Sequence, residues 1–180
     1  MRLKGAEALA ALLGKASNRR LVEGLTSAGV EFVVIGGVAL AYHGIRDPFE
    51  VDDLDLLLEP NKKTAETVTS ALSAALPNRG FVERDITPGS KIVFRSPDPF
   101  YADLIFGERI EKAPEIINGS IVVTVGSTAL RVASVGHLRT MKERVVENFR
   151  KELKTLERNL NEFNEKLQKH ERDLDALKAA

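Results

Sequence analysis

The sequence contains no cysteine, no excess of charge of either sign and no long apolar run. Without cysteine, disulfide frameworks, thiolate zinc sites and cysteine nucleophiles are excluded. The 26 basic residues are matched by 26 acidic ones, so the chain as a whole lacks the basic character of nucleic-acid-binding domains. No stretch approaches the roughly 18 consecutive apolar residues of a membrane-spanning helix. We therefore expect a cytoplasmic protein without a membrane segment.

What is present is the composition of a globular protein. Of its 180 residues, 43% are apolar and 29% are charged, which suits one domain with room for an appendage. Apolar and β-branched runs predict strands at 32–35, 51–58, 81–82, 92–94, 101–106, 121–125 and 129–132. Helical spacing predicts helices at 6–13, 17–28, 38–43 and 61–76. Because helices and strands alternate first and strands cluster later, we expect an α/β (α+β) fold with a mixed sheet flanked by helices.

From residue 134 the pattern changes to that of one long helix. No proline or glycine follows Gly136, and a seam of residues spaced by three and four runs through Val146, Phe149, Leu153, Leu156, Leu160, Phe163, Leu167, His170, Leu174 and Leu177. A single helix would expose this stripe to water, so we expect it to pack on another helix. The sequence predicts a core over 1–133 and a long coiled-coil helix over 134–180 that forms a homodimer. Packing against the helix at 6–13 is the alternative.

A pair of glycines separates the first predicted strand from the helix after it. Gly36 and Gly37 would let a phosphate group approach the backbone and the free N–H groups of the helix, although most such pairs at strand ends are simple turns. Arg46 follows in an acidic loop. It is a candidate for binding a triphosphate, or else a solvated loop arginine.

Three acidic residues interrupt apolar strands. Asp53 and Asp55 share one strand face because side chains alternate with period two, and aspartate is unfavourable in strands. Two ionised carboxylates there need a cation, and their hard oxygens suit Mg²⁺ or Mn²⁺. Asp103, in another strand, would complete the ligand set of a two-metal site, or it is simply an acid near a strand end. A solvated sheet face remains open for the pair, as does a calcium loop made from Asp47, Glu50, Asp52 and Asp53.

In this order the motifs resemble the nucleotidyltransferase superfamily that includes DNA polymerase beta, the minimal nucleotidyltransferases and abortive-infection toxins. The matching segments are 33–44, 53–58 and 102–105, and the resemblance covers roughly residues 20–145. The pattern Gly-Gly-x-Ala-x-x-x-His-Gly-x-Arg from Gly36 to Arg46 resembles the toxin–antitoxin branch. The segment 132–142 resembles that branch's stretch leading to a Met-Lys pair, which ends here at Lys142.

The resemblance implies a metal-dependent nucleotidyltransferase that moves a nucleoside monophosphate from a nucleoside triphosphate to a hydroxyl of RNA (tRNA) or protein. In this interpretation the catalytic and metal-binding residues are Asp53, Asp55 and Asp103, and the nucleotide-binding residues are Gly36, Gly37, Arg46 and Lys142. Asp103 would also orient or deprotonate the acceptor. The alternative is a non-catalytic antitoxin or scaffold of the same fold that acts through its coiled coil.

Overall fold

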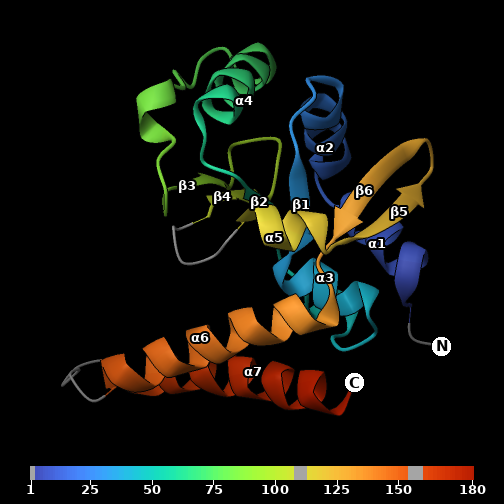
Figure 1. The fold of residues 1–180 in the computed structure, drawn as a ribbon, viewed down its shortest axis with the longest axis vertical. Coiled ribbons are helices and arrows are strands. Elements are labelled where there is room, and N and C mark those ends of the chain that lie inside the picture. Colours follow the sequence, from blue (N-terminus) through green and yellow to red (C-terminus); the bar gives the residue numbers. More distant parts are fainter. Residues whose placement is uncertain (1–2, 108–112, 154–159) are drawn as a thin grey trace. The chain divides into compact units, whose positions relative to one another are not determined.

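The computed structural model describes residues 3–107, 113–153 and 160–180, and side chains are described outside 153–162 (Figure 1). The chain divides into two compact units, Met1–Ala133 and Ser134–Ala180, and each is considered by itself. Within the described ranges, no helix combines the length and apolar character needed to cross a membrane.

The first unit is built on a six-stranded sheet in the order β3-β4-β2-β1-β6-β5. Its strands are β1 (Phe32–Ile35), β2 (Leu54–Leu58), β3 (Lys91–Phe94), β4 (Ala102–Phe106), β5 (Ile121–Val125) and β6 (Thr128–Val132). The β2–β4 and β1–β6 pairs are parallel, and the β1–β2, β3–β4 and β5–β6 pairs are antiparallel. The prediction of a mixed sheet is therefore confirmed. β1 is buried along its whole length, as its uniformly apolar sequence predicts for an interior strand.

Five helices of this unit are described: α1 (Gly5–Leu13), α2 (Asn18–Ser27), α3 (Gly36–Tyr42), α4 (Lys62–Ala75) and α5 (Ala113–Asn118). α4 begins where expected because the Asn61 side chain accepts a hydrogen bond of 2.8 Å from the Thr64 N–H, an N-cap that satisfies one of the free donors of the first turn. Its inward face buries Ala65, Val68 and Leu72.

The predicted strand at 81–82 is wrong. The segment is irregular and leads into a short 3-10 helix, η2 (Glu83–Asp85). Phe81 packs on other side chains instead of pairing in the sheet: its ring lies 6.2 Å from the Phe94 ring, and the Arg79 guanidinium stacks on both rings. Val82 is exposed. Two apolar residues are too short a pattern to distinguish a strand from a packed loop.

The second unit is a pair of packed helices, α6 (Val135–Leu153) and α7 (Leu160–Ala179). Lys142 Nζ lies 2.9 Å from Nδ1 of His170, 28 residues along the chain, whereas one straight helix would separate them by about 42 Å. The structure thus differs from the single helix expected over 134–180. The apolar seam of one helix can pack on the other helix of the same chain without a second molecule. Two helices joined in one chain are at high effective concentration for each other.

The seam residues that the structure describes cover one another within this hairpin. Val146, Leu167 and Leu174 form a buried cluster with Phe149 packed against it, and the Phe149 and Phe163 rings lie 4.7 Å apart. Three other seam positions, Leu153, Leu156 and Leu160, lie outside the described side chains. The exposed stripe that motivated a homodimer is therefore largely covered, and the dimer stays a prediction.

Candidate functional site

Strand register brings the three predicted acids to one place. Ile35 of β1 lies opposite Asp55 of β2, and Asp55 in turn lies opposite Asp103 of β4. Asp53 precedes β2 and shares the face of Asp55 by period two. Asp53, Asp55 and Asp103 each offer an oxygen within 4.8 Å of the others. We call these three residues the carboxylate triad. Asp103 is its most buried member, with 1% of its surface exposed.

The two glycines lie directly against this site. Gly36 has a φ of +61°, and a Cβ added there would overlap the Asp55 carboxylate. A Cβ on Gly37 would lie 3.0 Å from Nη1 of Arg46, and Arg46 is only 8% exposed. The predicted nucleotide-binding loop, one triad member and the predicted arginine are therefore packed together. Arg46 is not a solvated loop side chain.

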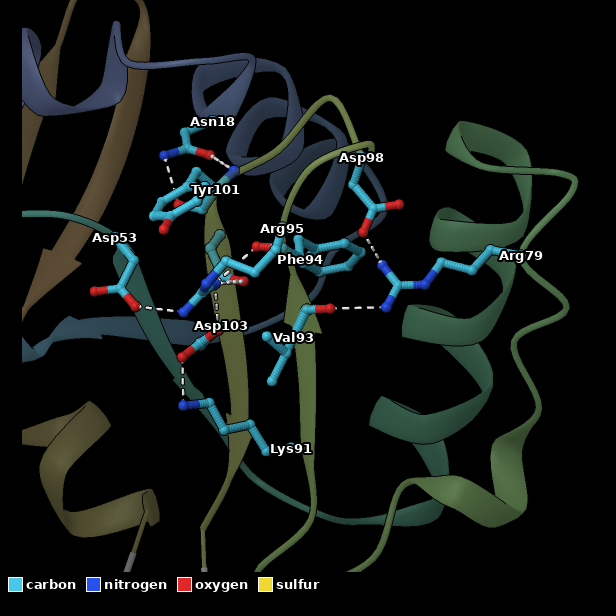
Figure 2. Close-up of polar contacts among 11 residues, drawn as sticks. Asn18, Asp53, Arg79, Lys91, Val93, Phe94, Arg95, Asp98, Tyr101 and Asp103 are labelled. Carbon is cyan, nitrogen blue, oxygen red and sulfur yellow. Dashed lines mark hydrogen bonds and ion pairs between the residues drawn. The ribbon is translucent and has the colours of Figure 1, made fainter. Parts of the chain in front are cut away.

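Two cations contact the triad that the sequence analysis did not single out (Figure 2). The Arg95 guanidinium donates to Asp103 Oδ1 at 2.8 Å and to Asp53 Oδ2 at 2.6 Å. The Lys91 ammonium pairs with the other oxygen of Asp103. Both cations come from β3 or the residue after it, and the register places Val93 opposite Asp103. Side chains alternate along a strand, so Lys91, Val93 and Arg95 lie on the same face as Asp103. This alternation could have identified the two cations, but only if the pairing of Val93 with Asp103 were already known.

Arg95 is held from several sides. Its Nη1 also donates to the Phe94 carbonyl at 2.7 Å and to the Ala102 carbonyl at 3.3 Å, and its guanidinium lies 4.6 Å from the centre of the Tyr101 ring. Burial by itself lowers the pKa of Arg95. The hydrogen bond to Asp103 and the charges of Asp103, Asp53 and Tyr101 outweigh burial, so the pKa is raised above its usual value. Arg95 is a permanent positive charge at the triad.

The N-terminal helical region anchors the segments that carry the triad. Asn18, 2% exposed, bonds both backbone groups of Tyr101: its Nδ2 donates to the carbonyl at 3.0 Å, and its Oδ1 accepts from the N–H at 2.8 Å. Lys15 donates to the Val51 carbonyl at 2.6 Å. These bonds fix the entry to β4 and the chain just before Asp53, so the triad rests on a rigid frame.

Two other predictions from the sequence concern Lys142 and the alternative calcium loop. Lys142 belongs to the second unit, where its ammonium lies 3.1 Å from Asp173 Oδ2, and its contact with a triphosphate stays a prediction. Asp47, part of the alternative calcium loop, instead caps the short 3-10 helix η1 (Pro48–Glu50) by accepting from the Phe49 N–H at 3.0 Å. The described geometry therefore favours the triad over that loop as the place where acids converge.

Comparison with known proteins gives a likeness in structure alone. No protein-family model matches the sequence, and no curated protein matches it. A crystal structure of an antigenic nucleotidyltransferase-like protein from Paracoccidioides brasiliensis is similar to this chain with a TM-score of 0.51 and 14% sequence identity. The match covers 98% of this chain and 78% of that one. At this identity the likeness concerns the fold, and the fold of this chain is nucleotidyltransferase-like.

Proposed function

We propose that the protein is a divalent-metal-dependent nucleotidyltransferase. The observation that carries the proposal is the convergence of Asp53, Asp55 and Asp103 beside Gly36, in a fold similar to a nucleotidyltransferase-like protein. Three converging carboxylates, one of them packed against Gly36, provide a candidate cation site, and the glycine pair leaves room for a phosphate group.

The triad fits a small divalent cation. Its ligand atoms lie within 4.8 Å of one another, and two oxygens bound to one Mg²⁺ lie at most about 4.2 Å apart. Adjacent oxygens in an octahedral Mg²⁺ site lie about 3 Å apart, so the carboxylates would move closer together when they bind the ion. All three donors are the hard oxygens that Mg²⁺ and Mn²⁺ prefer. Asp53 and Asp55 would hold the metal, with Asp103 completing the ligand set.

The proposed reaction transfers a nucleoside monophosphate from a nucleoside triphosphate. The acceptor oxygen forms a bond to the α-phosphorus while the bond from that phosphorus to the bridging oxygen breaks, and pyrophosphate leaves. Asp103 orients the acceptor hydroxyl and takes its proton. The bound metal supplies Lewis-acid stabilisation of the developing charge. Gly36 and Gly37 admit the phosphates to the backbone, and Arg46, already packed on Gly37, neutralises part of their charge.

The finer parts of the proposal depend on the motif resemblance. It favours a hydroxyl of tRNA or of a protein as acceptor, and a place in a toxin–antitoxin system. Lys142 would contact the triphosphate only after giving up its ion pair with Asp173. A homodimer through the C-terminal helices belongs to the same set of proposals.

One observation favours a non-catalytic module as a second candidate. Arg95 and Lys91 pair with oxygens of Asp53 and Asp103, so the chain's own side chains already neutralise part of the triad. A nucleotidyltransferase-like antitoxin or scaffold would need no more than this. Such a protein would bind its partner without releasing pyrophosphate.

Label transfer distinguishes the two candidates. The protein is incubated with each α-³²P-labelled nucleoside triphosphate, Mg²⁺ or Mn²⁺, total tRNA and proteins of the same cell. We expect transfer by the wild type, none by Asp53→Ala, and full transfer by Asp52→Ala, a matched control because Asp52 is an exposed neighbour outside the triad. Equal transfer by Asp53→Ala contradicts the metal-ligand role. Absence of transfer and of nucleotide binding in the wild type favours the non-catalytic module.

A further inference from the structure

The carboxylates of Asp53 and Asp103 meet although the strand register does not place the two residues opposite each other. The register of β2 and β4 pairs Asp55 with Asp103, and Asp53 comes two residues earlier, just before β2. Two residues along a strand and one strand across correspond to about 8 Å between Cα atoms. The ligand atoms of the triad nevertheless lie within 4.8 Å of one another. The Asp53 carboxylate therefore extends toward Asp103, against the repulsion between two like charges.

One guanidinium joins these two carboxylates. Arg95 donates from Nη2 to Asp53 Oδ2 at 2.6 Å and from Nη1 to Asp103 Oδ1 at 2.8 Å (Figure 2). The donors of a guanidinium form a planar fork of fixed geometry. The fork therefore restrains both the distance between the two carboxylates and the direction in which each of them points.

Asp103 and Arg95 are themselves held in place by other groups. The second oxygen of Asp103 pairs with Lys91, and the Asp103 side chain is only 2% exposed. The Arg95 guanidinium donates to the Phe94 carbonyl at 2.7 Å and lies 4.6 Å from the centre of the Tyr101 ring. These contacts make Asp103 and Arg95 a fixed point from which a third side chain can be oriented.

Asp53 occupies a less constrained position. It lies before β2 rather than within it, and its side chain is 30% exposed. In the part of the chain that the structure describes, its carboxylate makes its hydrogen bond and its ion pair with Arg95. The orientation of the Asp53 carboxylate therefore depends on Arg95.

We propose that Arg95 is a positioning residue: its guanidinium holds the Asp53 carboxylate beside Asp103 and thereby sets the affinity of the triad for a divalent cation. The inference rests on the proposed function and adds to it a residue that lies outside the motif pattern. A carboxylate has about four acceptor positions, so Asp53 can bind an ion and keep its bond to Arg95. A ligand that is already oriented loses less conformational freedom on binding, which is why the guanidinium favours the ion despite its own charge.

Mn²⁺ binding in the absence of nucleotide tests the inference. The six-line electron paramagnetic resonance signal of free Mn²⁺ gives the dissociation constant without any reference to activity. Arg95→Met removes the donors and keeps an unbranched side chain. We expect it to weaken binding by about 10–100-fold, the usual cost of losing a group hydrogen-bonded to a metal ligand. Arg95→Lys keeps the charge but replaces the fork by a single ammonium, and it should also bind Mn²⁺ more weakly than the wild type.

A second arginine provides a matched control. The side chains of Arg79 and Arg95 are both 35% exposed. Arg79 likewise pairs with an aspartate, Asp98, and donates to a backbone carbonyl, that of Val93, at 2.7 Å, but Asp98 lies outside the triad. Arg79→Met should therefore bind Mn²⁺ as tightly as the wild type. Circular dichroism establishes that each variant is folded before its affinity is compared.

A crystal structure of the wild type grown with Mn²⁺ is a second test, and it needs no variant to fold. We expect the ion to bind Asp53 while Nη2 of Arg95 keeps its hydrogen bond to the same carboxylate. An ion that takes the place of the guanidinium on Asp53 overturns the inference, because Arg95 would then compete with the metal instead of orienting its ligand.

The outcomes separate the inference from the function on which it rests. Arg95→Met that binds Mn²⁺ as tightly as the wild type, or more tightly, overturns the inference and leaves the nucleotidyltransferase proposal standing. Arg95→Lys with the affinity of the wild type also overturns it, since charge without the fork would then suffice. Failure of the wild type to bind Mn²⁺ contradicts the metal-dependent function and the inference with it. A wild type that binds Mn²⁺ but transfers no label contradicts the function alone, because the comparison of affinities needs no transfer.

Discussion

Both compact units bury charged side chains, but the two clusters differ in which groups they bring together. In the first unit, the three carboxylates of the triad converge, and Arg95 and Lys91 contact Asp53 and Asp103. In the second, the ammonium of Lys142 lies 3.1 Å from one Asp173 oxygen and 2.9 Å from a ring nitrogen of His170. We call these three residues the hairpin cluster. The triad thus gathers acids from separate segments of the chain, whereas the hairpin cluster pairs a lysine with an aspartate across two helices.

The difference indicates different roles. Three acids that converge at one place are typical of a binding or catalytic site. The ion pair of the hairpin joins two helices instead. It fixes which residues of the two helices face each other, the role best documented for buried polar groups between helices. We therefore propose that the triad binds a ligand and that the hairpin cluster aligns α6 with α7.

The largest expected effect is on the ligand side of this comparison. Asp55→Asn keeps the shape of the side chain but removes the charge of a proposed metal ligand. We expect nucleotidyl transfer to fall by at least about 100-fold, since changes even to groups behind a metal ligand cost 10–100-fold in affinity or activity. Label transfer measures the loss, and circular dichroism should show an intact fold.

Asp98→Asn is the control for this variant, because Asp98 is an aspartate paired with an arginine outside the triad. It should transfer label like the wild type. An unfolded Asp55→Asn protein, or one with full activity, contradicts the role of Asp55 as a ligand.

The second effect is on stability and concerns the hairpin cluster. Asp173→Ala leaves the buried Lys142 without its carboxylate partner at 3.1 Å, and breaking a buried pair in this way costs about 3–5 kcal/mol. Asp175→Ala, on the exposed side of α7, should stay within about 0.5 kcal/mol. Amide hydrogen exchange of α6 and α7 measures the free energy of opening. Equal protection in the two variants would show that the cluster does not align the helices.

The two clusters were also unequally predictable from the sequence. Asp53 and Asp55 share a strand, so period two places them together without further information. The addition of Asp103 came from the order of motifs, because the parallel pairing of β2 with β4 is not encoded locally. Arg95 was missed for the same reason: its meeting with Asp53, 42 residues away, depends on the register of two strand pairs.

The hairpin shows a different limit. A seam of apolar residues indicates that a helix has a partner, but it does not say whether the partner belongs to the same chain. The sequence after Gly136 contains no glycine or proline that would mark the end of a helix. The pattern therefore predicts a single helix. For α5, by contrast, the sequence does carry local helix signals: Pro114 lies in its first turn and Gly119 follows its last residue.

A third prediction tests the backbone beneath the triad. Gly36→Ala adds a Cβ that overlaps the Asp55 carboxylate at a φ of +61°. The left-handed conformation alone costs an alanine roughly 1–2 kcal/mol, and Asp55 must also move. We expect lower stability and a loss of the Mn²⁺-induced rise in melting temperature.

Gly24→Ala is the matched control for this substitution. Gly24 lies within α2, and nothing is found within 4 Å of an added Cβ. The change should stabilise the protein by about 0.4–1 kcal/mol and leave the response to Mn²⁺ intact. A Gly36→Ala protein with the same metal response would show that Asp55 does not depend on the space beside this glycine.

The smallest expected effect concerns the ring under Arg95. The guanidinium lies 4.6 Å from the Tyr101 ring centre, a contact worth about 0.5–1 kcal/mol at a partly exposed position. Tyr101→Leu should therefore lower the free energy of unfolding by no more than about 1 kcal/mol, measured by urea denaturation. Phe49→Leu, which alters a ring that is 86% exposed, is the control and should change stability by less than about 0.5 kcal/mol. Because the bonds from Arg95 to Asp53 and Asp103 do not involve the ring, Tyr101→Leu should keep the label transfer of the wild type. Loss of transfer would show that the two carboxylates alone do not hold Arg95 at the triad.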